Sequence, residues 1–161
     1  MRYAFSFIGM VVLIFIAFII SMSLKPHTIV PTTVSPRFAQ ALIAGREFSL
    51  EVADTPELRT RGLSGHAELA DQQGMLFLFD TPGNYAFWMR GMQFPIDIIW
   101  LRGDEIVSIA ANAAPPAVGT PDTELERFTP DAPADRVIEL RAGLARELGL
   151  APRQQLQILV P

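Results

Sequence analysis

The stretch of sequence that decides the fold is FWMRGMQFPIDIIWL, which spans Phe87–Leu101. It contains two apolar runs rich in aromatic and branched side chains, the kinds of side chain that favour strands. We therefore expect strands at Tyr85–Met89 and Ile96–Leu101. The polar turn Arg102–Glu105 and the apolar run Ile106–Ala110 follow, so the second strand is expected to begin a hairpin.

Similar patterns continue on both sides of this stretch. Phe48, Leu50 and Val52 alternate with polar residues, as in a half-buried strand. The remaining expected elements are strands at Gly74–Phe79, Arg136–Leu140 and Leu156–Val160, and short helices at Pro56–Gly62 and Ala142–Leu148. About seven short strands with two short helices predict an α+β, mainly β domain. A small barrel-like or sandwich arrangement would leave the fewest free strand edges.

The N-terminal segment is apolar on every side. Tyr3–Leu24 contains 22 residues and no charge, and at about 1.5 Å per residue it is long enough to cross a bilayer core of about 30 Å. Ser21-Met22-Ser23 has small residues at a spacing that suits signal cleavage, so a signal peptide is the alternative. We expect a transmembrane anchor or signal segment at 1–24, a Pro-rich linker at 25–45 and a single mainly-β domain at 46–161.

Basic residues flank the apolar segment. Arg2 and the amino terminus precede it and Lys25 follows it, which favours an N-terminus inside the cell and a translocated domain. We therefore expect a single-pass protein of the cytoplasmic membrane whose domain lies outside the cytoplasm. The alternative is a secreted or periplasmic domain after signal cleavage. In the first case the membrane is a partner through the N-terminal segment.

Composition excludes several classes of protein. The chain has no Cys and two His, so thiolate zinc sites, iron–sulfur clusters and a cysteine nucleophile are excluded, and we expect no metal and no cofactor. The net charge is -4, and residues 26–161 carry 11 Arg against 17 acidic residues. An acidic domain without basic runs argues against nucleic acid as a partner. We expect the domain to be a monomer.

Asp97 is a carboxylate inside an otherwise apolar strand. Alternation puts it on the same face as Ile99 and Leu101, and a buried charge must be paired or hydrogen-bonded. The candidate donors are Arg61 above all, Arg59 and Arg90, or backbone amides near Gly91. Asp97 is then either a structural residue that fixes a turn or the helix at 56–62, or a polar anchor at the floor of a ligand cleft.

Other residues are candidates for the same cleft. Trp88 and Met89 are core residues by default, or else the apolar wall of a cleft in which Arg90 is a further polar anchor. Glu139 lies in an apolar strand, and simple alternation predicts that it faces outward. Alternatively, Glu139 pairs with Asp97 as a general acid and base.

Six blocks of residues stand in a recognisable order and spacing: Arg61-Gly62-Leu63, Gly74–Phe79, Phe87-Trp88-Met89, Pro95-Ile96-Asp97, Ile138-Glu139-Leu140 and Ala142-Gly143. Over roughly residues 46–160 they resemble a family of bacterial and archaeal proteins, the domain of unknown function 192. The resemblance implies a small, mainly β domain, often behind a signal or anchor segment, and no established activity. The site candidates that match its pattern are Arg61, Trp88, Met89, Arg90, Pro95, Asp97 and Glu139.

The chain departs from the family pattern at two places. Gly91 and Met92 stand where the family commonly has Asn and Thr, and Ala151-Pro152 stands near the usual Gly-Asp. We expect the first change to remove polar side chains beside Asp97.

Three functions remain open. The first is a non-catalytic binding module for a small polar ligand, such as a sugar or an anionic metabolite, with these candidate residues: Arg61, Trp88, Met89, Arg90, Asp97 and Glu139. The second is a structural or partner-binding domain without a ligand pocket. The third is a hydrolase that uses Asp97 and Glu139 as an acid–base pair. We favour the binding module, then the structural domain. The hydrolase ranks last, because the sequence offers no nucleophile or metal set.

Overall fold

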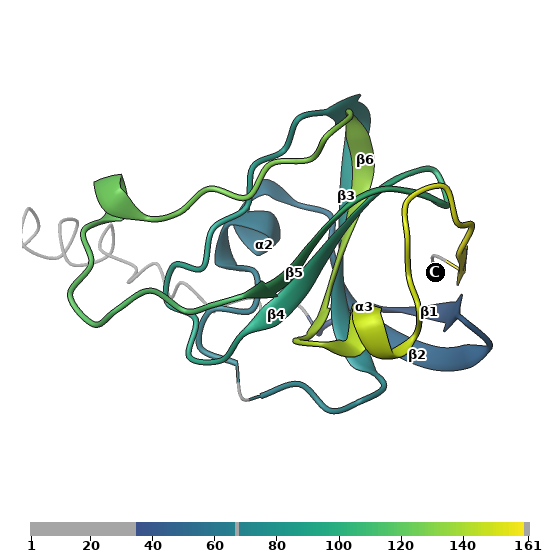
Figure 1. Cartoon of the computed structure of the whole chain (residues 1–161), viewed down its shortest axis with the longest axis horizontal. Helices are drawn as coiled ribbons and strands as arrows, with labels where there is room; N and C mark the ends of the chain where they lie inside the picture. The colour runs from purple at the N-terminus through teal and green to yellow at the C-terminus, as the bar shows by residue number, and fades with distance from the viewer. Residues whose placement is uncertain (1–34, 67, 160–161) are drawn as a thin grey trace, which may run out of the picture. The chain divides into compact units, whose positions relative to one another are not determined.

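The computed structural model describes residues 35–66 and 68–159. Seven strands form one sheet in the order β5-β4-β6-β3-β2-β1-β7 (Figure 1). The strands are β1 (Phe38–Ile43), β2 (Arg46–Ala53), β3 (Gln73–Gly83), β4 (Ile96–Arg102), β5 (Glu105–Ala113), β6 (Ala134–Arg141) and β7 (Gln157–Leu159). The helices are α2 (Pro56–Arg61), α3 (Leu144–Glu147) and the single 3-10 turn η1 (Asp122–Glu124).

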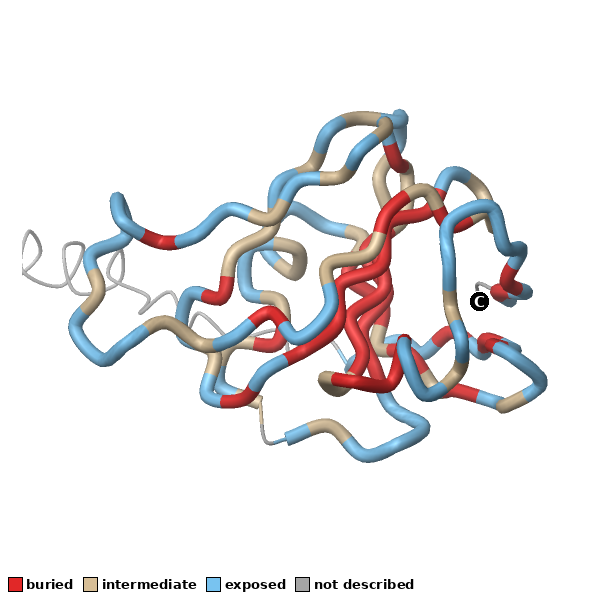
Figure 2. Tube along the Cα trace, viewed as in Figure 1, coloured by how far each residue is buried: buried red, intermediate tan, exposed pale blue. Residues whose placement is uncertain are grey.

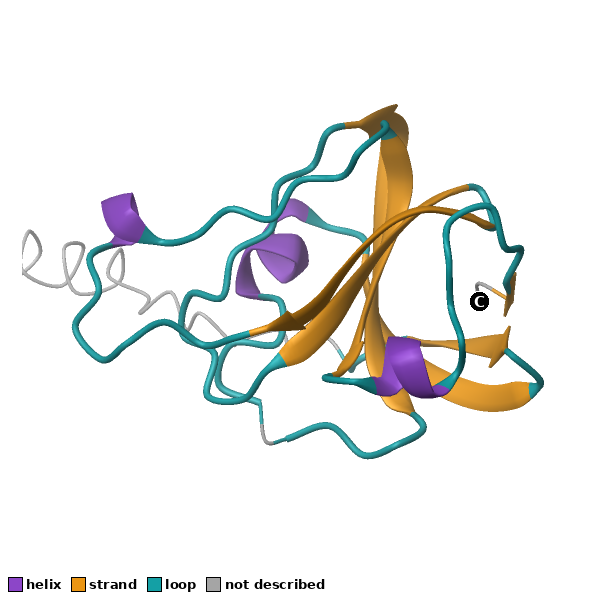
Figure 3. Ribbon diagram, in the orientation of Figure 1, coloured by secondary structure: helices purple, strands orange, loops and turns teal. Residues whose placement is uncertain are grey.

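The sheet is antiparallel apart from one pair. β2 and β3 run parallel, and α2 lies in the connection between them. The segment just before β7 also hydrogen-bonds to the β4–β5 hairpin. The N–H of Leu156 donates to the carbonyl of Asp104 over 2.8 Å, and the N–H of Ile106 donates to the carbonyl of Gln154 over 2.9 Å. These bonds link the two ends of the strand order, and the sheet curls into a half-barrel (Figure 3).

Both faces of the central strands β3, β4 and β6 are covered. The consecutive residues Ile96–Leu101 of β4 are all buried, whereas a strand with one open face would expose every second residue. One core fills the inside of the curl and includes residues of β1 and α3. The second core lies on the other face, where Leu58 of α2 packs against it. The buried residues concentrate in the central strands, with α2 and α3 on opposite sides of them (Figures 2 and 3).

Each of the two α-helices has an N-terminal cap. At α2, the side chain of Thr55 accepts a hydrogen bond from the N–H of Leu58 over 3.2 Å, and a proline occupies the first helical turn. At α3, the N-cap residue Gly143 has no side chain to offer. The carboxylate of Asp97 on β4 takes this role, because it accepts hydrogen bonds from the N–H groups of Gly143 and Ala145 over 3.1 and 2.8 Å.

The mainly β fold with two short helices is confirmed, and α2 and α3 lie within the two ranges expected to be helical. Two expectations about strands are wrong. Tyr85–Met89 is not a strand, because only Phe87 finds a bridge partner, Phe128 of a long loop. The linker was expected to extend to residue 45, but Phe38–Ile43 pair with β2 as β1. Its alternation is hard to detect because two of its three buried residues are alanines.

The expected anchor or signal segment at 1–24 and the first ten residues of the expected linker lie outside the described residues. That part of the sequence analysis therefore stays a prediction. Within residues 35–66 and 68–159, no helix has the length and apolar character needed to span a bilayer.

Candidate functional site

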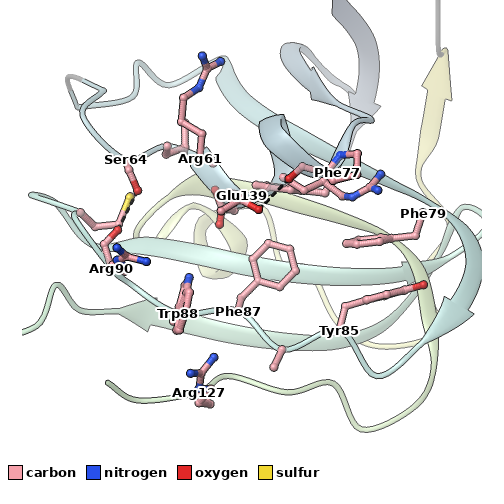
Figure 4. A pocket seen from close by; sticks show the side chains of 17 residues that line it. Arg61, Ser64, Phe77, Phe79, Tyr85, Phe87, Trp88, Arg90, Arg127 and Glu139 are labelled. Carbon is pink, nitrogen blue, oxygen red and sulfur yellow. Dashed lines mark hydrogen bonds between the residues drawn. The ribbon is translucent and has the colours of Figure 1, made fainter. Parts of the chain in front are cut away.

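A cavity of about 400 Å³ lies on the α2 side of the sheet (Figure 4). α2 and the turn after it form one wall, and the segment between β3 and β4 forms the opposite wall. The main lining side chains are Arg59, Arg61 and Ser64 on the first wall, Tyr85, Phe87, Trp88 and Arg90 on the second, Phe77 and Phe79 from β3, Arg127 from the long loop, and Glu139 from β6. Small-molecule sites span about 300–1,000 Å³, so the cavity has the size of such a site.

Glu139 lies at the floor of this cavity and is 5% exposed. Its partners on the neighbouring strands are Met75 of β3 and Ile98 of β4, and both are buried. Within the described part of the chain, its Oε2 atom has no hydrogen-bond partner. Burial raises the pKa of Glu139 to about 8, because an ionised carboxylate is poorly solvated there. The carboxyl group is therefore mostly neutral at pH 7.

The expectation that Glu139 faces outward is wrong. Simple alternation assumes a strand with one open face, but β6 lies in the middle of the sheet between β4 and β3. The turn after α2 and the aromatic side chains of the cavity cover the face that alternation would leave in water.

Three guanidinium groups that line the cavity are only weakly engaged. Arg61 contacts Glu51 at 3.4 Å and Arg90 contacts Asp122 at 3.3 Å, and both arginine side chains are more than half exposed. Such exposed ion pairs contribute about 0–1 kcal/mol, so an anionic ligand could replace them at little cost. Arg127 has no ion pair among the described residues, and its guanidinium lies over the ring of Trp88.

Trp88 connects two of these arginines. The guanidinium carbon of Arg127 lies 4.0 Å from the ring centroid of Trp88, and that of Arg90 lies at 5.8 Å. Arg127 reaches the cavity because the backbones of Phe87 and Phe128 exchange two hydrogen bonds, of 2.8 and 2.9 Å. The long loop between β5 and β6 is thereby fixed against the wall that carries Trp88 (Figure 4).

The other end of the cavity is aromatic and more rigidly built. The rings of Phe79 and Tyr85 stack with their centroids 3.6 Å apart, and the guanidinium of Arg59 lies over the ring of Phe79. Arg59 also donates through one nitrogen to the carbonyls of Asp54 and Leu78 over 2.8 and 2.7 Å. The bond to Leu78 ties α2 to β3, and the bond to Asp54 ties it to the residue after β2. Arg59 therefore supports the wall and is less available to a ligand than the other three arginines.

Asp97 lies outside this cavity. It is fully buried on the inside of the curl, where its carboxylate accepts hydrogen bonds from the N–H groups of Asn112, Gly143 and Ala145. Backbone donors, and not Arg61, therefore satisfy its charge. This arrangement is the structural alternative of the sequence analysis, although Asp97 fixes α3 and not the helix at 56–62.

Asp97 and Glu139 do not form an acid–base pair. In the ladder between β4 and β6, Asp97 stands opposite Leu140 and Glu139 stands opposite Ile98. Residues that stand opposite each other share a face, and neighbours along a strand alternate between faces. The two carboxyl groups therefore point to opposite sides of the sheet, and the hydrolase that would use them together is contradicted by the geometry.

The structure brings four of the six ligand-binding candidates to the cavity, namely Arg61, Trp88, Arg90 and Glu139. Met89 is buried in the core at 3% exposure, and Asp97 supports α3 on the other face. The family departure at Gly91 and Met92 concerns the cavity and not Asp97. Met92 lines the cavity, and a Cβ on Gly91 would lie 3.4 Å from Oγ of Ser64.

Several lining residues were not singled out from the sequence. Phe77, Phe79 and Tyr85 lie in or beside expected strands, where aromatic residues are ordinary core residues. Arg127 lies in a Pro-rich loop that has no hydrophobic periodicity. Only the contact of Phe128 with Phe87 places Arg127 at the cavity, and no sequence signal marks that contact.

The fold and the site define a small mainly β domain with a ligand-sized cavity on the α2 side of a curled sheet. The chain belongs to the DUF192 family, described as an uncharacterised ACR, which matches residues 39–158. The family resemblance inferred from the sequence blocks is thereby confirmed. A search of curated proteins found no match.

The solved structures similar to this chain include two that match most of its length. One is a Sinorhizobium meliloti protein described as a candidate transcription regulator, with 26% identity and a TM-score of 0.65 over 77% of this chain and 94% of that one. The other is a Novosphingobium aromaticivorans protein of unknown function, with 28% identity and a TM-score of 0.64 over 79% of this chain and 89% of that one. Both likenesses cover most of each chain, so they concern the whole domain.

Proposed function

We propose that this protein is a non-catalytic binding module whose cavity takes a small ligand with an anionic group. One observation carries the proposal: three weakly engaged guanidinium groups surround a single aromatic-walled cavity of about 400 Å³. Guanidinium groups bind carboxylates and phosphates through paired hydrogen bonds. Aromatic walls supply the apolar contact that a small ligand needs.

The lining of the cavity supports binding over catalysis. Among the described residues, Glu139 is the only carboxylate that lines it, and no histidine does. The hydroxyl of Ser64 donates to the carbonyl of Arg90 over 2.8 Å, so it has no base beside it to activate it. The alternative of a structural or partner-binding domain without a ligand pocket has less support, because it gives no role to a buried carboxyl at the floor of a cavity.

A thermal-shift measurement on the purified protein tests the proposal. Benzoate, phenyl phosphate and inorganic phosphate are the anionic probes, and benzyl alcohol is the neutral control. A ligand that binds only the folded state raises the melting temperature. We expect at least one aromatic anion to do so, and Arg127→Ala to weaken the effect several-fold. Arg146→Ala is the matched control, because Arg146 is exposed on α3, on the other side of the sheet.

Two results would contradict the proposal. The first is a shift with benzyl alcohol as large as that with benzoate. The second is a shift with the anions that Arg127→Ala and Arg146→Ala change equally. The charge of this chain argues against the transcriptional role proposed for the Sinorhizobium meliloti protein. Residues 26–161 have six more acidic residues than arginines, and an acidic domain is repelled by DNA.

We also propose that the N-terminal segment tethers or exports this module, so that it works as a monomer outside the cytoplasm. The uncharged run Tyr3–Leu24 and the flanking residues Arg2 and Lys25 support this orientation. A reporter that is active only outside the cytoplasm, fused after Pro161, should be active. A silent fusion at full expression would reject the orientation, and cell fractionation would separate a tethered from a cleaved form.

A further inference from the structure

We infer that Glu139 binds the deep end of the ligand as a hydrogen-bond donor. The ligand is then a flat molecule with an anionic group at one end and a hydrogen-bond acceptor at the other. This inference rests on the proposed function and deepens it, because it names the class of molecule and its orientation in the cavity.

The position of Glu139 supplies the first step. Its side chain lies among the labelled residues at the centre of the cavity (Figure 4), while Oε2 has no hydrogen-bond partner in the part of the chain that the structure describes. Buried polar groups are almost always hydrogen-bonded. A carboxyl oxygen without a partner at the floor of a cavity is therefore available to a molecule that enters the cavity.

The surroundings of Glu139 decide which form of the carboxyl group is present. Its strand partners Met75 and Ile98 are apolar and buried, and no arginine forms an ion pair with it among the described residues. A charge in this place would be uncompensated. Burial raises the pKa of Glu139 to about 8, in agreement with a neutral group that carries a proton to donate.

The remaining walls give the shape of the ligand. The ring of Phe87 stands edge-on to that of Phe77 with centroids 4.9 Å apart, and Trp88 follows Phe87 along the same wall. These rings suit a planar apolar body. Arg90 and Arg127 lie at the Trp88 end of the cavity (Figure 4). When the anionic group of the ligand binds there, the hydrogen-bond acceptor at the opposite end of the ligand can reach Glu139.

A matched pair of probes tests the inference on the full chain in a mild detergent. Quinoline-6-carboxylate carries a ring nitrogen that accepts a hydrogen bond, and 2-naphthoate has the same shape and charge without it. We expect quinoline-6-carboxylate to bind about tenfold more tightly near neutral pH, as one hydrogen bond to a buried donor allows. Isothermal titration calorimetry measures both affinities.

The pH dependence gives a second readout that needs no variant. If only neutral Glu139 binds, the apparent dissociation constant of quinoline-6-carboxylate rises about tenfold between about pH 6.5 and about pH 9, because the competent fraction falls above the pKa of about 8. The other ionisable side chains that line the cavity are Arg59, Arg61, Arg90, Arg127 and Tyr85. Guanidinium groups in general do not lose their proton in proteins, and the Tyr85 hydroxyl donates to the carbonyl of Thr81.

Glu139→Gln keeps a donor in place but cannot ionise. We expect this variant to bind quinoline-6-carboxylate with an affinity that no longer changes between about pH 6.5 and about pH 9. Glu139→Leu should bind the two probes equally. Circular dichroism confirms that each variant is folded, and the comparison of probes on the unaltered chain stands if a variant is not.

The outcomes separate this inference from the proposed function. Equal, pH-independent binding of both probes overturns the role of Glu139 and leaves the anion-binding module intact. Binding that strengthens as the pH rises also overturns it, since Glu139 would then act as a carboxylate. If neither probe binds and no anion raises the melting temperature, the proposed function fails as well.

Discussion

Asp97 and Glu139 stand on neighbouring strands one register position apart, and their side chains point to opposite faces of the sheet. Asp97 accepts three backbone hydrogen bonds, whereas the Oε2 atom of Glu139 has no partner among the described residues. The same chemical group therefore has two roles in one small area. One carboxylate fixes the fold inside the curl, and the other is a neutral group exposed only to a cavity.

Asp97→Asn should lower the free energy of unfolding by about 3 kcal/mol, since it weakens charge-assisted bonds and turns an amide N–H toward a backbone N–H of α3. Asp80→Asn is the control, because Asp80 is exposed at the end of β3. Urea unfolding compares the two variants with the unaltered protein. Equal midpoints for both variants would show that α3 does not depend on this carboxylate.

Glu139 should make stability fall as the pH rises. Its carboxyl group keeps a proton in the folded protein up to a pKa of about 8, but in the unfolded chain it ionises near its ordinary pKa of 4.5. The unfolded state therefore binds fewer protons between these values, and stability is lost across that window. The difference between the unaltered protein and Glu139→Gln isolates this slope, with an upper limit of about 5 kcal/mol. If the free energies of unfolding of the two proteins changed in parallel from pH 4.5 to pH 8, the pKa of Glu139 would not be raised.

Gly74→Ala should destabilise the protein by about 3 kcal/mol or more. A Cβ on Gly74 would lie 2.5 Å from the carbonyl oxygen of Glu139 and 2.8 Å from side-chain carbons of Leu140 and Leu50, so β3 and β6 would have to separate. At Gly45 a Cβ meets nothing within 4 Å and only the positive φ opposes it, so Gly45→Ala should cost about 1 kcal/mol. Guanidinium unfolding ranks the two variants, and the reverse order would count against the close approach of β3 and β6.

Thr55→Ala should lower stability by about 1 kcal/mol, because the N–H of Leu58 loses its capping partner. Thr55→Ser keeps the hydroxyl and should lie near the unaltered protein. Since α2 forms a wall of the cavity, the Ala variant should also bind aromatic anions more weakly. A Ser variant as unstable as the Ala variant would assign the effect to the methyl group and not to the cap.

The periodic parts of the fold were predictable from the sequence. The strand around Phe48, the hairpin from Ile96 to Ala110 and the capped helix at Pro56 were all visible, because they combine strong hydrophobic patterns with local turn and cap signals. β1 was missed because two alanines give little hydrophobic contrast. The prediction of a strand at Tyr85–Met89 is wrong because its aromatic residues line a cavity. The segment has no strands on both sides to pair with, and only Phe87 forms an isolated bridge.

The site was predictable only as a set of residue types. Arg61, Trp88, Arg90 and Glu139 came from unusual residues and a family pattern, but their assembly depends on which face of the sheet each residue occupies. Glu139 was expected to face outward because a sequence does not show that its strand is central. Arg127 needed a contact between distant segments that leaves no periodic signal.

The pairing of β1 with β7 has a consequence for how the chain folds. β1 pairs with β7, so that Gln40 stands opposite Leu159. Such pairing has a high contact order, and folding dominated by distant contacts is slow. β1 can find this partner only after the chain has been synthesised as far as β7. Until then β1 has one unpaired edge, and a truncated or stalled chain would expose that edge to association with other strands.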